Sequence, residues 1–310
     1  MRLVFAGTPS TAATVIRALK AASFDIALVI TRPDAPLGRK QIITASPVAI
    51  EAQQLGLEVL KTSVFTEEAH RAITEANADI GVVVAYGSFL PAETLSLLPN
   101  GWVNLHFSLL PKYRGAAPVQ HAILNGERET GVSVFQIDST MDGGRVYLQV
   151  PTTIEPSETT ERLLQRLTSL GVSALVEVIP QIVSGIAKSE PQNDSEKSFA
   201  PKISREQARI NWSSSATAVE SLICAMNPEP MAWTEFGGTS LRVISGTALL
   251  ASDDFRAQAG EVVLNGDQVQ VQCAYGTRLV LLEVQPAGKK IMSASDWYRG
   301  LIDPQGAKFE

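Results

Sequence analysis

The chain has 310 residues, of which 45% are hydrophobic and 19% are charged, an ordinary composition for a globular protein. Its formal net charge is −6, whereas many nucleic-acid-binding proteins carry an excess of positive charge. Any RNA contact therefore has to use local basic patches. We expect neither a signal peptide nor a membrane-spanning segment, because no stretch approaches the roughly 20 apolar residues that a span requires. The length favours two domains.

The cysteine content points to a reducing compartment. Cys224 and Cys273 are the only cysteines, and they do not form a metal-binding spacing. We expect both to be small buried apolar groups in a cytoplasmic protein.

The first half of the chain alternates apolar strands with helices. Strands are expected at residues 3–7, 24–30, 57–60, 79–85, 102–105, 131–137 and 145–154. Helices are expected at residues 11–22, 47–55, 66–76, 92–98 and 116–124. Ser10 is expected to cap the first helix, and residues 31–47, rich in Pro and Gly, to form a loop. This order predicts an α/β fold with a Rossmann-like, doubly wound and mostly parallel sheet.

The second half changes in composition. Leucines at helical spacing follow Ser157, which is the expected cap of a long helix that closes the first domain. A polar stretch is read as a linker at residues 188–208, between a catalytic domain at 1–187 and a smaller domain at 209–310. That smaller domain should hold a helix and short strands with regular turns, which predicts an OB-like β-barrel. The strands are expected at residues 232–236, 240–244, 260–264, 268–273 and 278–284.

Three side chains near predicted strand ends suit acid-base chemistry. Asn104 and His106 are two residues apart at the end of a strand, so they point to the same side of the sheet. Ligands of doubly wound sheets bind beyond the carboxyl ends of the strands. An amide and an imidazole there suit stabilisation of an oxyanion while a proton moves. Asp142, in the loop between the next two strands, could pair with the imidazole. The alternatives are a structural Asn–His pair and a simple turn aspartate.

Several motifs resemble the methionyl-tRNA formyltransferase family over essentially the whole chain. The Asn-x-His-x-Ser-Leu-Leu-Pro element from Asn104 to Pro111 resembles the signature of formyltransferases of this fold that use 10-formyltetrahydrofolate. The segment from Gln285 to Ala294 resembles the C-terminal domain of the branch that acts on tRNA. Other matching stretches lie at residues 5–9, 84–87 and 113–118.

The resemblance implies transfer of a formyl group from 10-formyltetrahydrofolate to the α-amine of methionyl initiator tRNA, for translation initiation, by a monomeric enzyme without a metal. It assigns catalysis to Asn104, His106 and Asp142. Asp142 is expected to raise the pKa of His106 and keep a charged donor near neutral pH. The resemblance also implies a folate site lined by four consecutive residues, Ser108, Leu109, Leu110 and Pro111.

The stretch 32–47 departs from the pattern of the family. In the family an equivalent basic loop enters the acceptor end of the tRNA, and here it is shorter and less basic. Arg39 and Lys40 are predicted to contact tRNA, with a mobile surface loop as the alternative. Phosphate contacts of this kind would weaken with salt. Lys289 and Lys290 are weaker candidates, since a lysine pair in a turn is usually only solvated.

Three rival functions share some of these features. A formyltransferase acting on an amino sugar nucleotide or another small amine would use the same three residues. A folate hydrolase would release formate, with water in place of the amine. A non-catalytic RNA-binding module should lack one of the three residues, and all are present. A nicotinamide cofactor is rejected, because Gly7-Thr8-Pro9 lacks the glycine spacing of the dinucleotide fingerprint.

Overall fold

The computed structural model describes residues 1–38, 40–249, 258–304 and 306–310. These residues form two compact units. The first unit contains Met1–Pro118, Glu129–Thr153 and Leu164–Pro201, and the second contains Val119–Arg128, Ile154–Leu163 and Lys202–Glu310. The domain limits expected from the sequence, at 187 and 209, stay a prediction.

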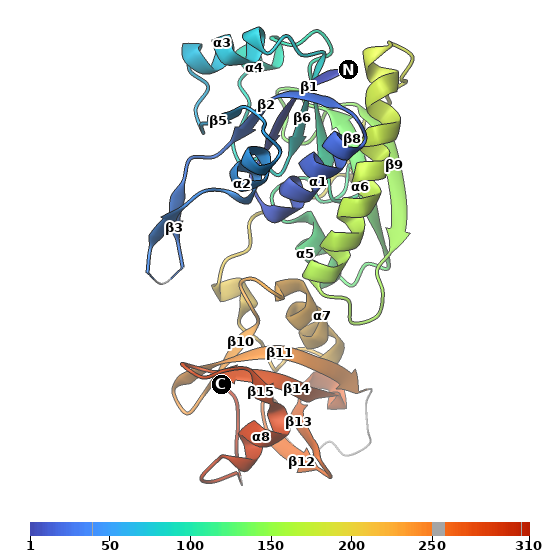
Figure 1. The fold of residues 1–310 in the computed structure, drawn as a ribbon. Coiled ribbons are helices and arrows are strands. Elements are labelled where there is room, and N and C mark those ends of the chain that lie inside the picture. The colour runs from blue at the N-terminus through green and yellow to red at the C-terminus, as the bar shows by residue number, and fades with distance from the viewer. Residues whose placement is uncertain (39, 250–257, 305) are drawn as a thin grey trace. The chain divides into compact units, whose positions relative to one another are not determined.

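A seven-stranded sheet forms the centre of the first unit, in the order β5-β2-β1-β6-β7-β8-β9 (Figure 1). Its strands are β1 (Arg2–Gly7), β2 (Asp25–Thr31), β5 (Val59–Lys61), β6 (Ile80–Val84), β7 (Trp102–His106), β8 (Glu129–Gln136) and β9 (Val146–Thr153). The first five strands in this order are parallel, and β8 and β9 are antiparallel to their neighbours. The predicted Rossmann-like, mostly parallel sheet is therefore confirmed.

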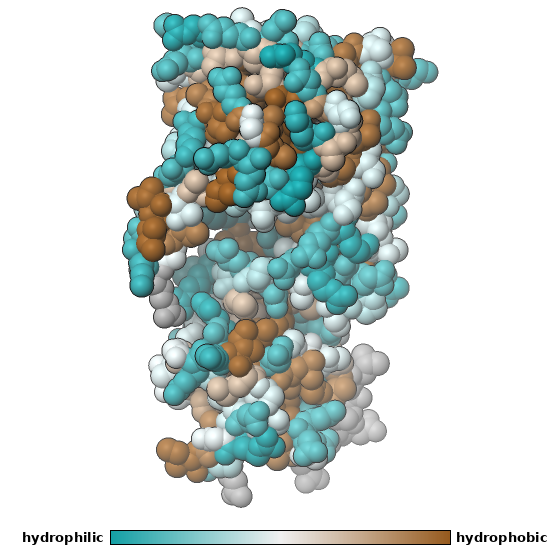
Figure 2. Space-filling model, viewed as in Figure 1, coloured by the Kyte–Doolittle hydropathy of each residue, from teal (hydrophilic) through white to brown (hydrophobic). Residues whose placement is uncertain are grey.

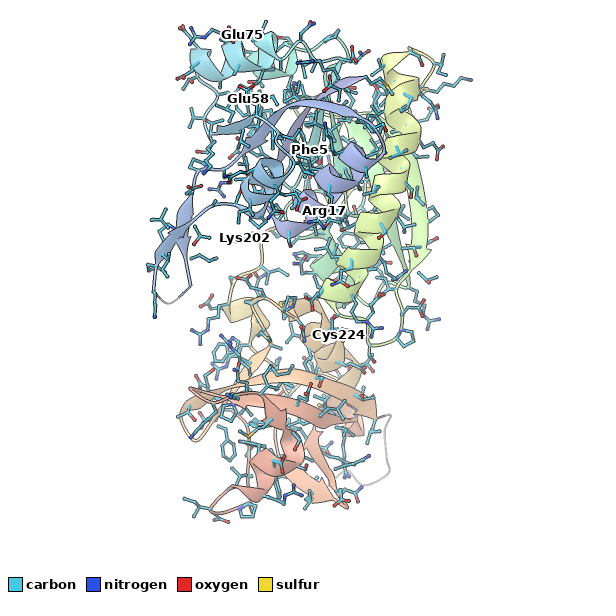
Figure 3. The ribbon with its side chains drawn as sticks, in the orientation of Figure 1. Phe5, Arg17, Glu58, Glu75, Lys202 and Cys224 are labelled. Atoms are coloured by element: carbon cyan, nitrogen blue, oxygen red, sulfur yellow. The ribbon has the colours of Figure 1, made fainter. Side chains whose placement is uncertain are left out.

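Helices cover the faces of this sheet. They are α1 (Ser10–Ala21), α2 (Pro47–Gln54), α3 (Glu67–Glu75), α4 (Ala92–Leu95) and α6 (Thr160–Val183). Another helix, α5 (Pro118–Leu124), belongs almost wholly to the second unit. Val4, Leu28 and Ile73 share a buried cluster on the face covered by α3. Arg17 of α1, labelled in Figure 3, donates from Nε to Glu51 Oε1 of α2 over 2.8 Å and so ties the two helices together.

Both expected serine caps are wrong. Ser10 is the first residue of α1, Pro9 precedes it, and no side chain caps this helix, which begins one residue earlier than expected. Ser157 lies three residues before α6, with a φ of 53°, and its hydroxyl donates to Glu220. The side chain that accepts an amide hydrogen at the start of α6 is that of Thr159.

By length and composition alone, α6 could cross a membrane, which the sequence did not lead us to expect. One side of it is buried, however, with Leu167, Leu175 and Ile179 fully inaccessible to solvent. Gly171 lies so close to β7 that an added Cβ would be 2.5 Å from Leu105 Cδ2. We therefore interpret α6 as a core helix, since such helices have the same length and composition.

The stretch expected to be a loop contains a β-hairpin. β3 (Ala35–Leu37) and β4 (Ile42–Thr44) pair in an antiparallel register. Leu37, Ile42 and Ile43 are each at least 60% exposed, and the hairpin carries brown, apolar atoms in Figure 2. Three-residue strands without a buried face leave no alternation in the sequence, so composition alone predicted a loop.

An antiparallel sheet in the order β10-β11-β14-β13-β12 forms the second unit, with β15 paired to β14. Its strands are β10 (Trp233–Phe236), β11 (Thr239–Leu249), β12 (Val262–Asn265), β13 (Gln268–Gln272), β14 (Arg278–Pro286) and β15 (Met292–Ser293). Trp212, Trp297 and Phe309 stack in its core together with α7 (Ala216–Met226) and α8 (Ala294–Arg299). The OB-like class is confirmed, while β15 and α8 were too short to predict.

Changing Gly81 to alanine should destabilise the first unit. Gly81 is the second residue of β6, and an added Cβ there would lie 2.1 Å from the fully buried ring of Trp102. Overpacking of this kind costs about 1–3 kcal/mol of unfolding free energy. Urea unfolding of Gly81→Ala, made alone and in a Trp102→Leu background, measures the effect. The cost should shrink in the second background, and an equal cost in both would contradict this packing.

Candidate active site

β7 carries Asn104 and His106 toward the edge of the sheet at which its parallel strands have their carboxyl ends. This strand lies between β6 and β8, with Asn104 opposite Val83 and Phe135, and His106 opposite Ser133. His106 is the last residue of β7 and is 5% exposed. Because side chains alternate along a strand, both residues project from the same face.

The hydrogen bond of His106 defines its tautomer. Nε2 lies 2.9 Å from the main-chain oxygen of Tyr113. A carbonyl oxygen can only accept, so Nε2 carries the hydrogen. In the neutral ring Nδ1 is then a bare acceptor, and it faces Asp142 Oδ2 at 3.9 Å. That distance is too long for a direct hydrogen bond, so a group between the two atoms could contact both.

Burial sets the charge of His106. Loss of water around the ring lowers the pKa of His106 below its ordinary value, while the Asp142 carboxylate and the bond to the Tyr113 carbonyl act in the opposite direction. Asp142 acts to raise the pKa of His106, as expected, but the net shift is downward, so the expectation of a charged donor near neutral pH is wrong. The carboxylate is present as predicted, but the desolvation of an almost inaccessible ring outweighs it, and His106 is neutral near pH 7.

A tight turn holds Asp142. Its φ is 47°, in the left-handed region, and its Oδ2 accepts a hydrogen bond from the Gly115 amide over 2.7 Å. The turn needs Gly144, because an added Cβ there would lie 1.8 Å from the main-chain oxygen of Gln136. The carboxylate is thus fixed by backbone geometry and by the loop that follows β7.

Asn104 has an unsatisfied atom. Its Oδ1 is buried and makes no hydrogen bond within the part of the chain that the structure describes. Leaving a buried acceptor unpaired costs about 1–3 kcal/mol. Such an atom calls for a partner, and a ligand that donates a hydrogen at this place would supply one.

Comparisons with known proteins identify the family. Residues 1–179 match the family described as formyl transferase, and residues 202–301 match its C-terminal domain. The methionyl-tRNA formyltransferase of Acidothermus cellulolyticus is 43% identical over all of both chains, and that of Thermobifida fusca is 44% identical over 100% of this chain and 99% of its own. The chain belongs to the methionyl-tRNA formyltransferase family.

Solved structures share the fold of this formyltransferase at low sequence identity. An N-formyltransferase of Helicobacter canadensis, in complex with folinic acid and dTDP-3-aminofucose, has a TM-score of 0.69 at 20% identity and covers 92% of this chain and 98% of its own. HypX of Aquifex aeolicus, in complex with tetrahydrofolic acid, has a TM-score of 0.65 at 15% identity and covers 96% of this chain and 46% of its own.

The segment 108–111, predicted to line the folate site, is held by hydrogen bonds from Ser133 and Gln149. Ser133 Oγ donates to the Ser108 carbonyl over 2.7 Å and accepts from the Leu110 amide over 3.1 Å. Gln149 Nε2 donates to the Leu110 carbonyl over 2.7 Å. These bonds fix the main chain of the segment from within the protein. Its role in lining the folate site stays a prediction.

Of the two basic residues predicted to contact tRNA, the structure describes one, Lys40. Arg39 lies outside the described residues. Lys40 is exposed at the hairpin, and Lys289 and Lys290 are exposed after β14. Exposure permits contact with phosphate, and the tRNA contacts stay predictions.

The cysteines are buried in apolar surroundings, as expected. Burial raises the pKa of Cys224 to about 11 and that of Cys273 to about 12, so both thiols stay protonated at neutral pH. Among the described residues, no group of three or more His, Cys, Asp and Glu side chains could hold a metal ion.

Two main-chain groups in the site were missed. The Tyr113 carbonyl orients His106, and the Gly115 amide anchors Asp142. The sequence carried a turn signal at Gly115, whose φ is 123°, but main-chain partners leave no side-chain pattern to read.

Proposed function

We propose that the chain transfers a formyl group from 10-formyltetrahydrofolate to the α-amine of methionine esterified to initiator tRNA. The observation that carries the proposal is the 40–44% identity over essentially the full chain to proteins named methionyl-tRNA formyltransferase. We expect the enzyme to act in the cytoplasm as a monomer, with Arg39 and Lys40 among its tRNA contacts.

The unpaired acceptors of the site fit an amine substrate. Asn104 Oδ1 is buried without a partner among the described residues, and the neutral His106 offers a bare Nδ1. A primary amine attacking a formyl carbon has two hydrogens to place, and it can donate to both atoms. The 3.9 Å between His106 Nδ1 and Asp142 Oδ2 also allows a bridging donor.

Asn104, His106 and Asp142 each have a separate role in this reaction. A bond forms between the methionine nitrogen and the formyl carbon, and the bond from that carbon to the folate nitrogen breaks. His106 Nδ1 takes the amine proton as general base, and the Asp142 carboxylate stabilises the imidazolium that results. His106 returns the proton to the departing folate nitrogen. The Asn104 amide donates to the formyl oxygen as its negative charge grows. The reaction requires no covalent enzyme intermediate.

Removing the Asn104 amide should slow the chemical step. Asn104→Ala is expected to lower kcat about 100- to 1,000-fold, the usual effect of losing one oxyanion donor. Steady-state kinetics with methionyl-tRNA measures it, and Asn265→Ala, at an exposed position of β12, is the matched control. A kcat within twofold of the unmodified chain would exclude Asn104 as the donor.

The activity itself is tested with the natural substrates. The protein is incubated with 10-formyltetrahydrofolate and methionyl initiator tRNA, and the released amino acid is analysed for formylmethionine, with uncharged tRNA as the control. Formate without formylmethionine would favour the folate hydrolase. Formylation of an amino sugar nucleotide, with none on the tRNA, would favour the small-amine enzyme.

A further inference from the structure

The polar stretch that we read as a linker is bonded to the loop that follows β7. Ser198 accepts from two amides of that loop, with its Oγ from Tyr113 over 2.9 Å and with its carbonyl from Arg114 over 2.9 Å. The Arg114 carbonyl accepts from the Ala200 amide over 2.7 Å. These bonds fix the peptide whose Tyr113 carbonyl orients His106. The residues from 192 to 200 are called the brace below.

At the other end of the brace, one side chain joins two loops. Gln192 Nε2 donates to the main-chain oxygens of Asp142, over 2.9 Å, and Gly144, over 2.7 Å. Gln192 Oε1 accepts from the Arg114 guanidinium, from Nη2 over 2.7 Å and from Nε over 3.1 Å. The Gln192 amide group therefore donates two hydrogen bonds to the Asp142 turn, while its oxygen accepts from the loop after β7.

Arg114 also binds Asp194, a second residue of the brace. Arg114 is only 6% exposed, and its Nη2 also donates to Asp194 Oδ1 over 2.8 Å. A buried guanidinium is stable only when its donors are paired. Arg114 therefore holds the brace at two places, and through Gln192 it holds the turn that carries Asp142.

We propose that Gln192 is a positioning residue that holds the Asp142 turn against the loop after β7, so that the carboxylate faces His106. The kinetic part of this inference rests on the proposed function. The Asp142 carboxylate already contacts that loop through the Gly115 amide, and Gln192 supplies the second attachment, from the main chain of the same residue. Without it the turn loses two donors and the carboxylate can move away from His106 Nδ1. A displacement of about 1 Å in a site can cost on the order of 100-fold in rate.

Gln192→Glu separates this role from simple packing. The variant keeps the size of the side chain and its acceptor toward Arg114, but it places an oxygen opposite the carbonyls of Asp142 and Gly144. We expect kcat for formyl transfer to fall about 100-fold, with KM for methionyl-tRNA within about twofold. Gln192→Ala should lower kcat at least as much. The matched control is Gln181→Glu, because the Gln181 amide donates to the Glu177 carbonyl of its own helix.

Hydrogen exchange provides a readout that does not need activity. Followed by mass spectrometry, exchange should quicken in Gln192→Glu over the peptides spanning 113–117 and 141–146, and stay unchanged in Gln181→Glu. Faster exchange in both peptides together with the lower kcat supports the proposal. If the unmodified chain transfers no formyl group, the proposed function fails, while faster exchange in both peptides still supports the brace. Unchanged exchange in either peptide, or an unchanged kcat in an active enzyme, would overturn it.

Discussion

Replacing His106 with alanine should lower kcat for formyl transfer about 100- to 10,000-fold, the usual range for loss of a general base. The neutral ring has its hydrogen on Nε2, held by the Tyr113 carbonyl, and its bare Nδ1 faces Asp142. Single-turnover assays with methionyl-tRNA measure the loss. His70→Gln is the control, because the His70 ring bonds Thr94, a residue outside the site.

The pH dependence distinguishes a base from a charged donor. A general base works unprotonated. The free α-amine of the substrate itself titrates at about pH 8 and so affects kcat/KM. The test therefore uses kcat at saturating methionyl-tRNA, which should fall as the pH drops through the pKa of His106, lowered by burial below its ordinary value of 6.5. Activity should therefore be level through neutral pH and lost on the acid side. A protonated donor would give the opposite slope, with activity lost as the pH rises. That second profile would exclude the base role.

Asp142→Asn should cost about 100- to 10,000-fold in kcat and also change the pH profile. The asparagine keeps an oxygen that can accept from the Gly115 amide, so the turn should persist. What disappears is the negative charge that stabilises the imidazolium and raises the pKa of His106. The acid limb of kcat should accordingly move to lower pH.

A matched change nearby tests whether the charge of Asp142 is responsible. Asp138 is exposed in the same loop and accepts from the Thr140 amide over 2.7 Å. Asp138→Asn removes one carboxylate of the loop without touching His106, and we expect kcat and the pH profile to stay unchanged. If the two variants behave alike, or if the acid limb of Asp142→Asn moves to higher pH, Asp142 does not act through His106.

The strand-end position of the site could be predicted because it depends on local pattern. Asn104 and His106 lie two residues apart on a buried strand, and this spacing alone puts them on one face. The loop between the next two strands places Asp142 near them. The charge state of His106 could not be predicted, because it depends on how deeply packing buries the ring.

The brace was missed for a different reason. Gln192 contacts residues 48 to 78 positions away in the sequence, and its stretch has no apolar periodicity. Polar composition then predicts a linker, although here main-chain and side-chain hydrogen bonds and the Arg114–Asp194 ion pair order the segment. The β3–β4 hairpin illustrates the same limit, since its strands pair only with each other and bury no face.

A structure of the protein with an unreactive folate analogue that carries a formyl group would test the central claim most directly. If the amide, the imidazole and the carboxylate converge on the formyl carbon, the formyl oxygen should lie about 3 Å from the Asn104 amide. His106 Nδ1 and Asp142 should then border the space on the side from which the amine attacks. A formyl group bound beyond the reach of both Asn104 and His106 would contradict the account.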